Sequence, residues 1–129
     1  MPDFFSHVFL GEAAAPAMPG TLQEAAAANP SLFRLGCQGP DLFFYYRLLS
    51  PGRHRRAVDF ASQCHDDNTR ELLAYGASFL LKHKEDRAFM AYWTGFLCHY
   101  ALDRSAHPFI DEHTSGFKDH KRLEMHLDA

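Results

Sequence analysis

The sequence predicts an all-α protein that folds as a single domain over residues 1–129. Apolar residues recur three and four positions apart through most of the chain, which is the spacing of one face of an α-helix. We find no run of alternating β-branched residues that would indicate a strand. A chain of 129 residues with 47% apolar side chains can bury one core, and no internal repeat or low-complexity linker divides it.

Proline residues separate the helices expected in the N-terminal part of the chain. Residues 3–14 form a first helix, which Pro16 ends. Thr21 and Glu24 have the spacing of a capping box and begin an alanine-rich second helix. That helix stops before Pro30, because the residue preceding a proline disfavours the helical conformation.

The middle of the chain carries an irregular segment and a cluster of aromatic residues. We expect SLFRLGCQGPD, residues 31–41, to be an irregular loop, and residues 41–49 to start a helix or an aromatic turn. A further helix is expected over 54–63. The aromatic side chains that follow Gly-Pro-Asp either wall a cleft for an acyl or base group or pack in the core. They are Phe43, Phe44, Tyr45 and Tyr46.

Longer helices are expected in the C-terminal half. Acidic and capping residues precede a helix near 67–83, and a second helix covers about 85–106. Pro108 places the end of that helix at the preceding residue. Residues 108–117 are then expected to be a loop, and 118–128 a last helix.

Composition and charge exclude several classes of protein. A net charge of −3 argues against a surface that binds duplex nucleic acid. The N-terminal segment lacks a basic region and has Asp3 and His7 among its apolar residues, so it is a poor signal peptide. No stretch is long and apolar enough for a transmembrane helix. An odd number of cysteines without a C-x-x-C motif indicates reduced thiols in a cytoplasmic protein. They are Cys37, Cys64 and Cys98.

Three metal-capable side chains recur four residues apart in HYALDRSAHP: His99, Asp103 and His107. On a helix they fall within an arc of about 80° and span about 12 Å along the axis. Zinc–ligand bonds of about 2.0–2.2 Å are too short for one ion to join both ends. If the stripe binds metal, it therefore serves more than one ion, with Asp103 in the centre and able to bridge. For any single histidine, a hydrogen-bonded core residue is the simpler interpretation.

Other candidate ligands each have a structural alternative. His120 and Glu124 repeat the four-residue spacing, either as ligands or as an exposed pair in a charged helix. Asp41 is either a helix N-cap or a metal ligand and general base held on a stiff backbone. His65 either opens a helix or binds metal, and His7 is either a core histidine or a ligand.

Four segments resemble the bacterial zinc-dependent phospholipase C family: MPDFFSHVFLGE, FRLGCQGPDLFFYYR, GFLCHYALDRSAHPFI and HKRLEMHLDA. This family is similar in fold to the fungal single-strand-specific nucleases. The resemblance covers nearly the whole chain and is strongest at HYALD-x3-HP and H-x3-E. It implies a compact multi-helix bundle with a metal-binding cleft, which holds closely spaced zinc ions and places an aspartate and a water at the reacting phosphate.

The resemblance also implies eight ligands in three sets, one for each zinc ion. Secreted members of the family expose an N-terminal Trp that binds the third ion, whereas this chain begins with Met1, so we expect two or three ions. The sets are Asp41, His65, His99 and Asp103; His107, His120 and Glu124; and His7 with Asp103.

The activity that the resemblance implies is metal-dependent hydrolysis of a phosphoester by an activated water, which Asp41 orients or deprotonates. The partner is then a small phosphoester or a phospholipid headgroup. One alternative is a helical metal-binding module that keeps this scaffold without turnover. Another is a metal phosphohydrolase of the His-Asp-doublet type, built on His65 and Asp66, although it leaves His120 and Glu124 without a role.

Overall fold

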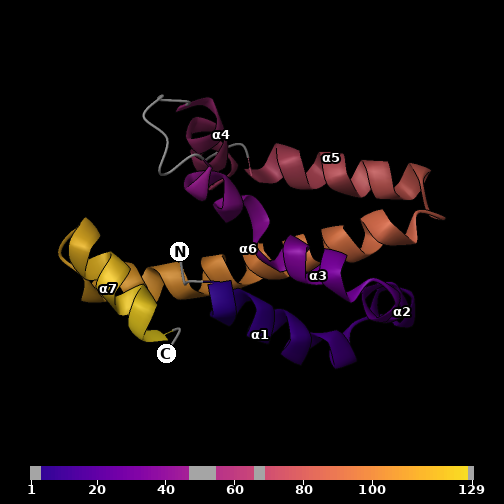
Figure 1. Cartoon of the computed structure of the whole chain (residues 1–129), viewed down its shortest axis with the longest axis horizontal. Helices are drawn as coiled ribbons and strands as arrows, with labels where there is room; N and C mark the ends of the chain where they lie inside the picture. Colours follow the sequence, from indigo (N-terminus) through magenta and orange to yellow (C-terminus); the bar gives the residue numbers. More distant parts are fainter. Residues whose placement is uncertain (1–3, 47–54, 66–68, 128–129) are drawn as a thin grey trace.

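The computed structural model describes residues 4–46, 55–65 and 69–127, without the side chains of residues 4, 55, 117, 120, 121 and 127. The described residues form helices and no strand, which confirms the predicted all-α class (Figure 1). In chain order the elements are α1 (Phe4–Ala14), η1 (Ala15–Ala17), α2 (Gly20–Ala28), α3 (Pro30–Cys37), η2 (Gly39–Tyr45), α4 (Arg55–His65), α5 (Thr69–Lys82), α6 (Arg87–His113) and α7 (Phe117–Leu127).

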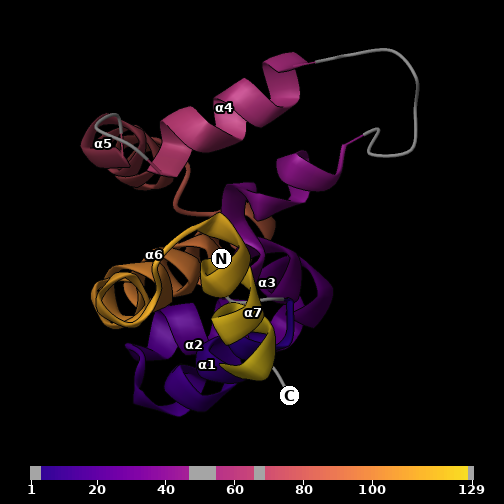
Figure 2. The same cartoon turned by 90° about the vertical axis from the view of Figure 1, so that its left-hand side faces the viewer.

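The 27-residue helix α6 is the axis around which the other elements are arranged. Helices α1, α2 and α3 pack along one side of it, whereas η2, α4 and α5 lie on another side (Figures 1 and 2). Helix α7 folds back beside the C-terminal part of α6 (Figure 1). Among the described residues, no helix combines the length and the apolar character that crossing a bilayer requires.

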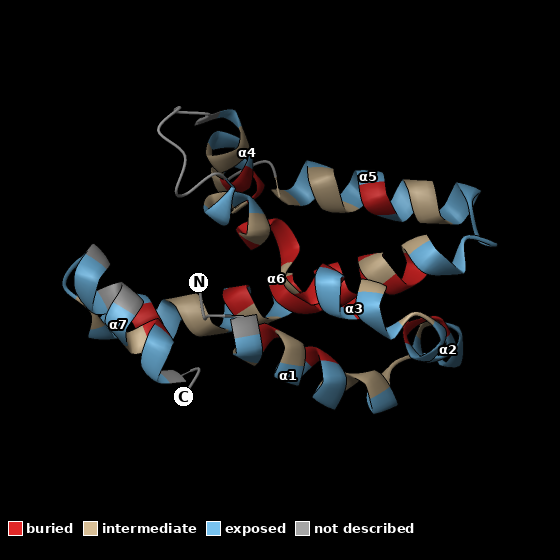
Figure 3. Cartoon of the chain, in the orientation of Figure 1, coloured by how far each residue is buried: buried red, intermediate tan, exposed pale blue. Residues whose placement is uncertain are grey.

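The core lies where α2 and α3 meet α6, and buried positions are concentrated along α6 (Figure 3). Glycines allow the backbones of α3 and α6 to touch. A Cβ atom at Gly36 would overlap the carbonyl of Tyr92, and one at Gly95 would overlap the carbonyl of Phe33. This close approach fixes where the end of α3, and the η2 segment that follows it, lie relative to α6.

The predicted loop over residues 31–41 is wrong, because most of it is helical. Pro30 occupies the first turn of α3, a position that proline favours, since its missing N–H has no partner there. The side chains of Phe33 and Cys37 and the backbone of Gly36 are buried on one face of α3. Packing of that face on α6 overrides the weak helical propensity of glycine in this segment.

The predicted end of the long helix before Pro108 is also wrong, since α6 continues to His113. Proline inside a helix removes one backbone hydrogen bond and usually kinks or ends it. Here the turn after Pro108 is held by Ile110, which is completely buried, and by the Thr114 hydroxyl, which donates to the carbonyl of Ile110 at 2.8 Å. Most of the loop predicted for 108–117 is therefore helix.

The predicted capping box is wrong as well. Helix α2 begins at Gly20 after Pro19, and no side chain caps its N-terminus. Thr21 lies inside the first turn, where its side chain cannot act as the N-cap. The helices predicted near 54–63, 67–83 and 118–128 correspond to α4, α5 and α7, whose bounds differ by a few residues.

Candidate metal centre

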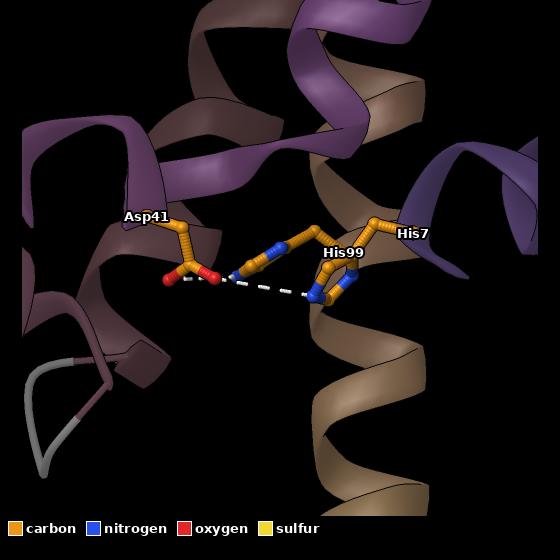
Figure 4. Close-up of side chains that lie close together, drawn as sticks. All are labelled: His7, Asp41 and His99. Atoms are coloured by element: carbon orange, nitrogen blue, oxygen red, sulfur yellow. Dashed lines mark ion pairs between the residues drawn. The ribbon is translucent and has the colours of Figure 1, made fainter. Parts of the chain in front are cut away.

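Five side chains from four elements converge beside α6. His7 comes from α1, Asp41 from η2, His65 from the last residue of α4, and His99 and Asp103 from adjacent turns of α6. His7 and His99 are 1% and 0% exposed, and the two aspartates are also buried. Figure 4 shows Asp41 facing the rings of His7 and His99, which stack with centroids 4.2 Å apart. The cluster is therefore formed by tertiary contacts between distant segments.

One half of this cluster consists of two imidazole nitrogens and one oxygen from each carboxylate. His65 Nε2 lies 2.9 Å from Asp41 Oδ1 and 3.4 Å from Asp103 Oδ2. His99 Nε2 lies 3.4 Å from the same oxygen of Asp103 and 3.9 Å from Asp41 Oδ1. In a tetrahedral zinc site with bonds near 2.1 Å, neighbouring ligand atoms are about 3.4 Å apart. The four nitrogen–oxygen distances lie on both sides of this value, and the ligand atoms of His65, His99 and Asp103 lie close enough together to hold one ion.

The second oxygen of each carboxylate lies on the side of His7. Asp103 Oδ1 lies 3.5 Å from His7 Nε2 and 3.9 Å from His107 Nε2. Asp41 Oδ2 lies 3.9 Å from His7 Nε2. Asp103 thus presents one oxygen to His65 and His99 and its other oxygen to His7 and His107.

The cluster leaves many buried polar atoms without hydrogen bonds. In the described part of the chain, nine buried side-chain nitrogen and oxygen atoms have no hydrogen-bond partner, and all nine belong to this cluster. Leaving one such group unsatisfied costs about 1–3 kcal/mol, and more when it is charged. A cation bound among these atoms removes that cost. The nine atoms are both nitrogens of His7 and His99, both oxygens of Asp41 and Asp103, and Nε2 of His65.

Burial and charge set the protonation of the cluster. Desolvation, aided by repulsion from His99, lowers the pKa of His7 to about 4, and desolvation lowers the pKa of His99 as well. Burial alone would raise the pKa of Asp103, but the neighbouring histidines outweigh it and lower the pKa to about 2. At neutral pH this places an ionised carboxylate beside neutral imidazoles, which are the protonation states that zinc requires of its ligands.

His65 behaves differently from the other two histidines. Burial lowers its pKa, but the carboxylates of Asp103 and Asp41 and the carbonyl of Ala61 together raise it to about 10. Without a metal, His65 is therefore protonated at neutral pH. A metal ion that binds to its Nε2 atom has to displace a proton.

A glycine with a left-handed backbone shapes the wall of the cluster. Gly39 has φ of 56°, a conformation that side chains with a Cβ rarely adopt. A Cβ at this position would also overlap the ring of His99. Gly39 therefore lets η2 pass directly against His99 and carry Asp41 into the cluster.

The comparison with known families agrees with this geometry. A family model described as zinc dependent phospholipase C matches residues 6–129. The chain belongs to the zinc-dependent phospholipase C family. No curated protein and no solved structure matches the chain. Members of this family depend on zinc, and the clustered His and Asp residues are a place where this chain can hold it.

The structure brings together some, but not all, of the predicted ligands of this phospholipase C family member. The five residues of the cluster lie together, and His107 lies at its edge, half-buried. Glu124, on α7, is 1% exposed, so the alternative of an exposed pair does not hold for it. The side chain of His120 and the whole of Asp66 lie outside the described residues, so the second set of ligands stays a prediction.

A cleft of about 380 Å³ opens beside the cluster of this zinc-dependent phospholipase C family member. His65, Asp103 and His107 line it, and they join the cluster to the cleft. The sequence analysis did not identify the other lining residues as parts of a site. Two of them, Tyr100 and Arg104, lie on the same helix as His99, Asp103 and His107. The full set of these other residues is Thr69, Leu73, Tyr100 and Arg104.

Proposed function

We propose that this protein is a zinc-dependent phosphoester hydrolase that cleaves its substrate at the cleft beside the cluster. The observation that carries the proposal is the group of nine unsatisfied atoms, whose nitrogen–oxygen spacing suits zinc. The match to the zinc-dependent phospholipase C family supports the same chemistry. When bound, zinc supplies positive charge that attracts phosphate oxygens and lowers the pKa of water.

Two ions can share the cluster through Asp103. Its Oδ2 is placed with His65 and His99, and its Oδ1 with His7 and His107, so one carboxylate serves both sides. We propose His120 and Glu124 as partners of His107 for a further ion. The number of ions in this proposal is two or three.

Asp41 is proposed as the group that orients and deprotonates the attacking water. Its carboxylate is buried at the junction of the two halves, with Oδ1 near His65 and Oδ2 near His7. The same oxygens can also bind metal, so the Asp41 experiment measures both metal content and turnover.

Arg104 supplies a further interaction with the substrate. It lines the cleft next to Asp103, and among the described lining residues it is the one that carries a fixed positive charge. A guanidinium can bind two phosphate oxygens at once. In this proposal Arg104 holds the substrate phosphate in the cleft.

Metal analysis tests the first part of the proposal. Protein purified without chelator should contain at least two zinc ions per chain by mass spectrometry of the dissolved metals. His99→Ala should lower that content, whereas His126→Ala, which changes an exposed histidine of α7, should not. Less than one ion per chain, or equal content in both variants, contradicts the proposal.

Turnover tests the second part and separates an enzyme from a binding module. The zinc-loaded protein should hydrolyse p-nitrophenylphosphorylcholine or bis-p-nitrophenyl phosphate. For Asp41→Asn, zinc content is measured together with turnover, and kcat per zinc-loaded chain should fall by at least about 100-fold. Asp59→Asn, on the exposed face of α4, should leave it unchanged. Full zinc content with no turnover on any phosphoester favours the module.

A further inference from the structure

Residues 43–46 form the run of aromatic side chains that follows Gly-Pro-Asp. The sequence left open whether these side chains wall a cleft or pack in the core. None of the four is buried, and none is among the described residues that line the cleft beside the metal cluster. Two of them, Phe43 and Phe44, instead make ring contacts with α4, the helix that ends in His65.

These two rings of η2 contact α4 at different positions along the helix. The ring of Phe43 meets that of Phe60 edge-on, with centroids 5.3 Å apart and planes at 90°. The ring of Phe44 lies 5.7 Å from that of His65, at the end of α4. Edge-to-face and tilted ring pairs at such distances attract one another. The η2 segment therefore holds both the middle and the end of α4.

Helix α4 depends on these contacts because it has little other support. Among the described elements it packs mainly on η2, and it lies at the edge of the molecule (Figure 2). An apolar cavity of about 360 Å³ beside the cleft is lined by Phe60 and by Trp93 of α6, so this cavity separates the two helices at that position. Only near its last turn does α4 bond to α6, where the Tyr100 hydroxyl donates to the carbonyl of Cys64.

The segment that makes these ring contacts also carries Asp41, whose Oδ1 lies 2.9 Å from Nε2 of His65. Asp41 and Phe44 are three residues apart on η2, so one turn places a carboxylate and an aromatic ring beside the same imidazole. We infer that Phe44 and Phe60 are positioning residues, which hold His65 where it can bind a metal ion in the cluster. This inference rests on the zinc site of the proposed function.

Zinc affinity, measured by competition with a chelator, tests the inference. Phe60→Leu and Phe44→Leu each remove a ring contact but keep an apolar side chain, and each should weaken zinc binding by about tenfold. Phe60→Tyr keeps the ring and should bind zinc as tightly as the native chain. Tyr46→Leu is the matched control, because Tyr46 is 53% exposed at the end of the same segment, and it should leave the affinity unchanged.

A double-mutant cycle separates the positioning of His65 from a general loss of stability. In a His65→Ala background, Phe60→Leu should no longer change zinc affinity, because the residue through which Phe60 acts is gone. A further tenfold loss in that background overturns the inference, since Phe60 would then support the cluster as a whole. Phe60 is 47% exposed, so its replacement should leave the helix content seen by circular dichroism unchanged, and Phe44→Leu provides a second variant for the same cycle.

Proton NMR of the metal-free protein distinguishes failure of this inference from failure of the proposed function. The ring centroids of His65 and His99 lie 5.6 Å apart, so nuclear Overhauser effects should connect their ring protons in the native chain and in Tyr46→Leu. These effects should weaken in Phe60→Leu and in Phe44→Leu. If the native chain shows this pattern but binds no zinc, the proposed function is overturned and the positioning role stands. Equal zinc affinity and equal Overhauser effects in all variants overturn the positioning role and leave the proposed function standing.

Discussion

The Nδ1 nitrogen of His65 lies 2.7 Å from the carbonyl oxygen of Ala61, one turn earlier in α4. A carbonyl can only accept, so Nδ1 keeps its proton, and once a metal displaces the second proton the ring presents its lone pair on Nε2. That atom faces the carboxylates of Asp41 and Asp103. Metal-binding histidines commonly have such a partner on their other nitrogen. The backbone of α4 thus sets the ring orientation at the end of the helix.

Gly39→Ala should weaken zinc binding at least tenfold. The substitution strains a left-handed backbone and pushes a methyl group into the ring of His99, which should also lower the free energy of unfolding by about 1–3 kcal/mol. Competition with a zinc chelator and urea unfolding measure the two effects. Gly20→Ala is the matched control, since a Cβ there meets no atom within 4 Å. Equal zinc affinity in both variants would disprove this role of Gly39.

Tyr100→Phe should loosen the end of α4. The Tyr100 hydroxyl donates to the carbonyl of Cys64, which also accepts from the hydroxyl of Thr69 at 2.8 Å. Loss of one hydrogen bond should lower the free energy of unfolding by about 1 kcal/mol. Zinc affinity should also fall, because His65 directly follows Cys64 in the chain. Tyr75→Phe, at a residue that is 72% exposed, is the control. Identical stability and zinc affinity in both variants would show that Tyr100 does not hold α4.

The metal-free protein should lose stability as the pH falls from 6.5 toward 4. The pKa of His7 is about 4 in the folded protein, whereas an unperturbed histidine has a pKa of 6.5. Between these two pH values His7 is protonated in the unfolded chain but neutral in the folded chain, so protonation favours unfolding. The lost stability is on the order of 3 kcal/mol for His7. His65 does not oppose this well below pH 6.5, because it is protonated in both states. Urea unfolding in the presence of EDTA measures the slope.

His7→Phe should reduce this pH dependence, since it replaces the buried imidazole by an apolar ring. The variant keeps His99, whose pKa is also lowered by burial, so part of the slope should remain. An unchanged slope in His7→Phe would show that His7 titrates normally in the folded state.

Arg104→Gln should raise KM and lower kcat/KM for phosphoesters, because it removes a guanidinium that binds phosphate oxygens. We expect a change of about tenfold, since an exposed guanidinium contributes less binding energy than a buried one. Arg104→Lys should recover part of the loss, since it keeps the charge but not the paired N–H groups. Steady-state kinetics on p-nitrophenylphosphorylcholine measure both. Arg87→Gln removes a charge near the start of the same helix and should have no effect. A similar loss in Arg87→Gln would indicate a general effect of net charge.

Local sequence patterns predicted the secondary structure correctly where contacts with distant parts of the chain did not override them. The periodicity of α5 and the start of α6 predicted helices at nearly their observed bounds. Predictions failed at α3 and beyond Pro108, where glycine and proline argued for loops. In both places the helix is held by burial against other elements, through Phe33 and Ile110, and a local pattern does not contain that contact.

The sequence by itself determined that Asp103 lies between His99 and His107, because helix geometry relates residues four apart without reference to any other element. The family resemblance added His7, Asp41 and His65 to the same centre. Only the tertiary structure decided how these residues meet: the contact of Gly36 and Gly95 brings α3 onto α6, and Gly39 lets η2 pass His99. The direction of each carboxylate oxygen and the apolar cavity beside the cleft depend on those crossings between helices, which residue spacing along one helix does not specify.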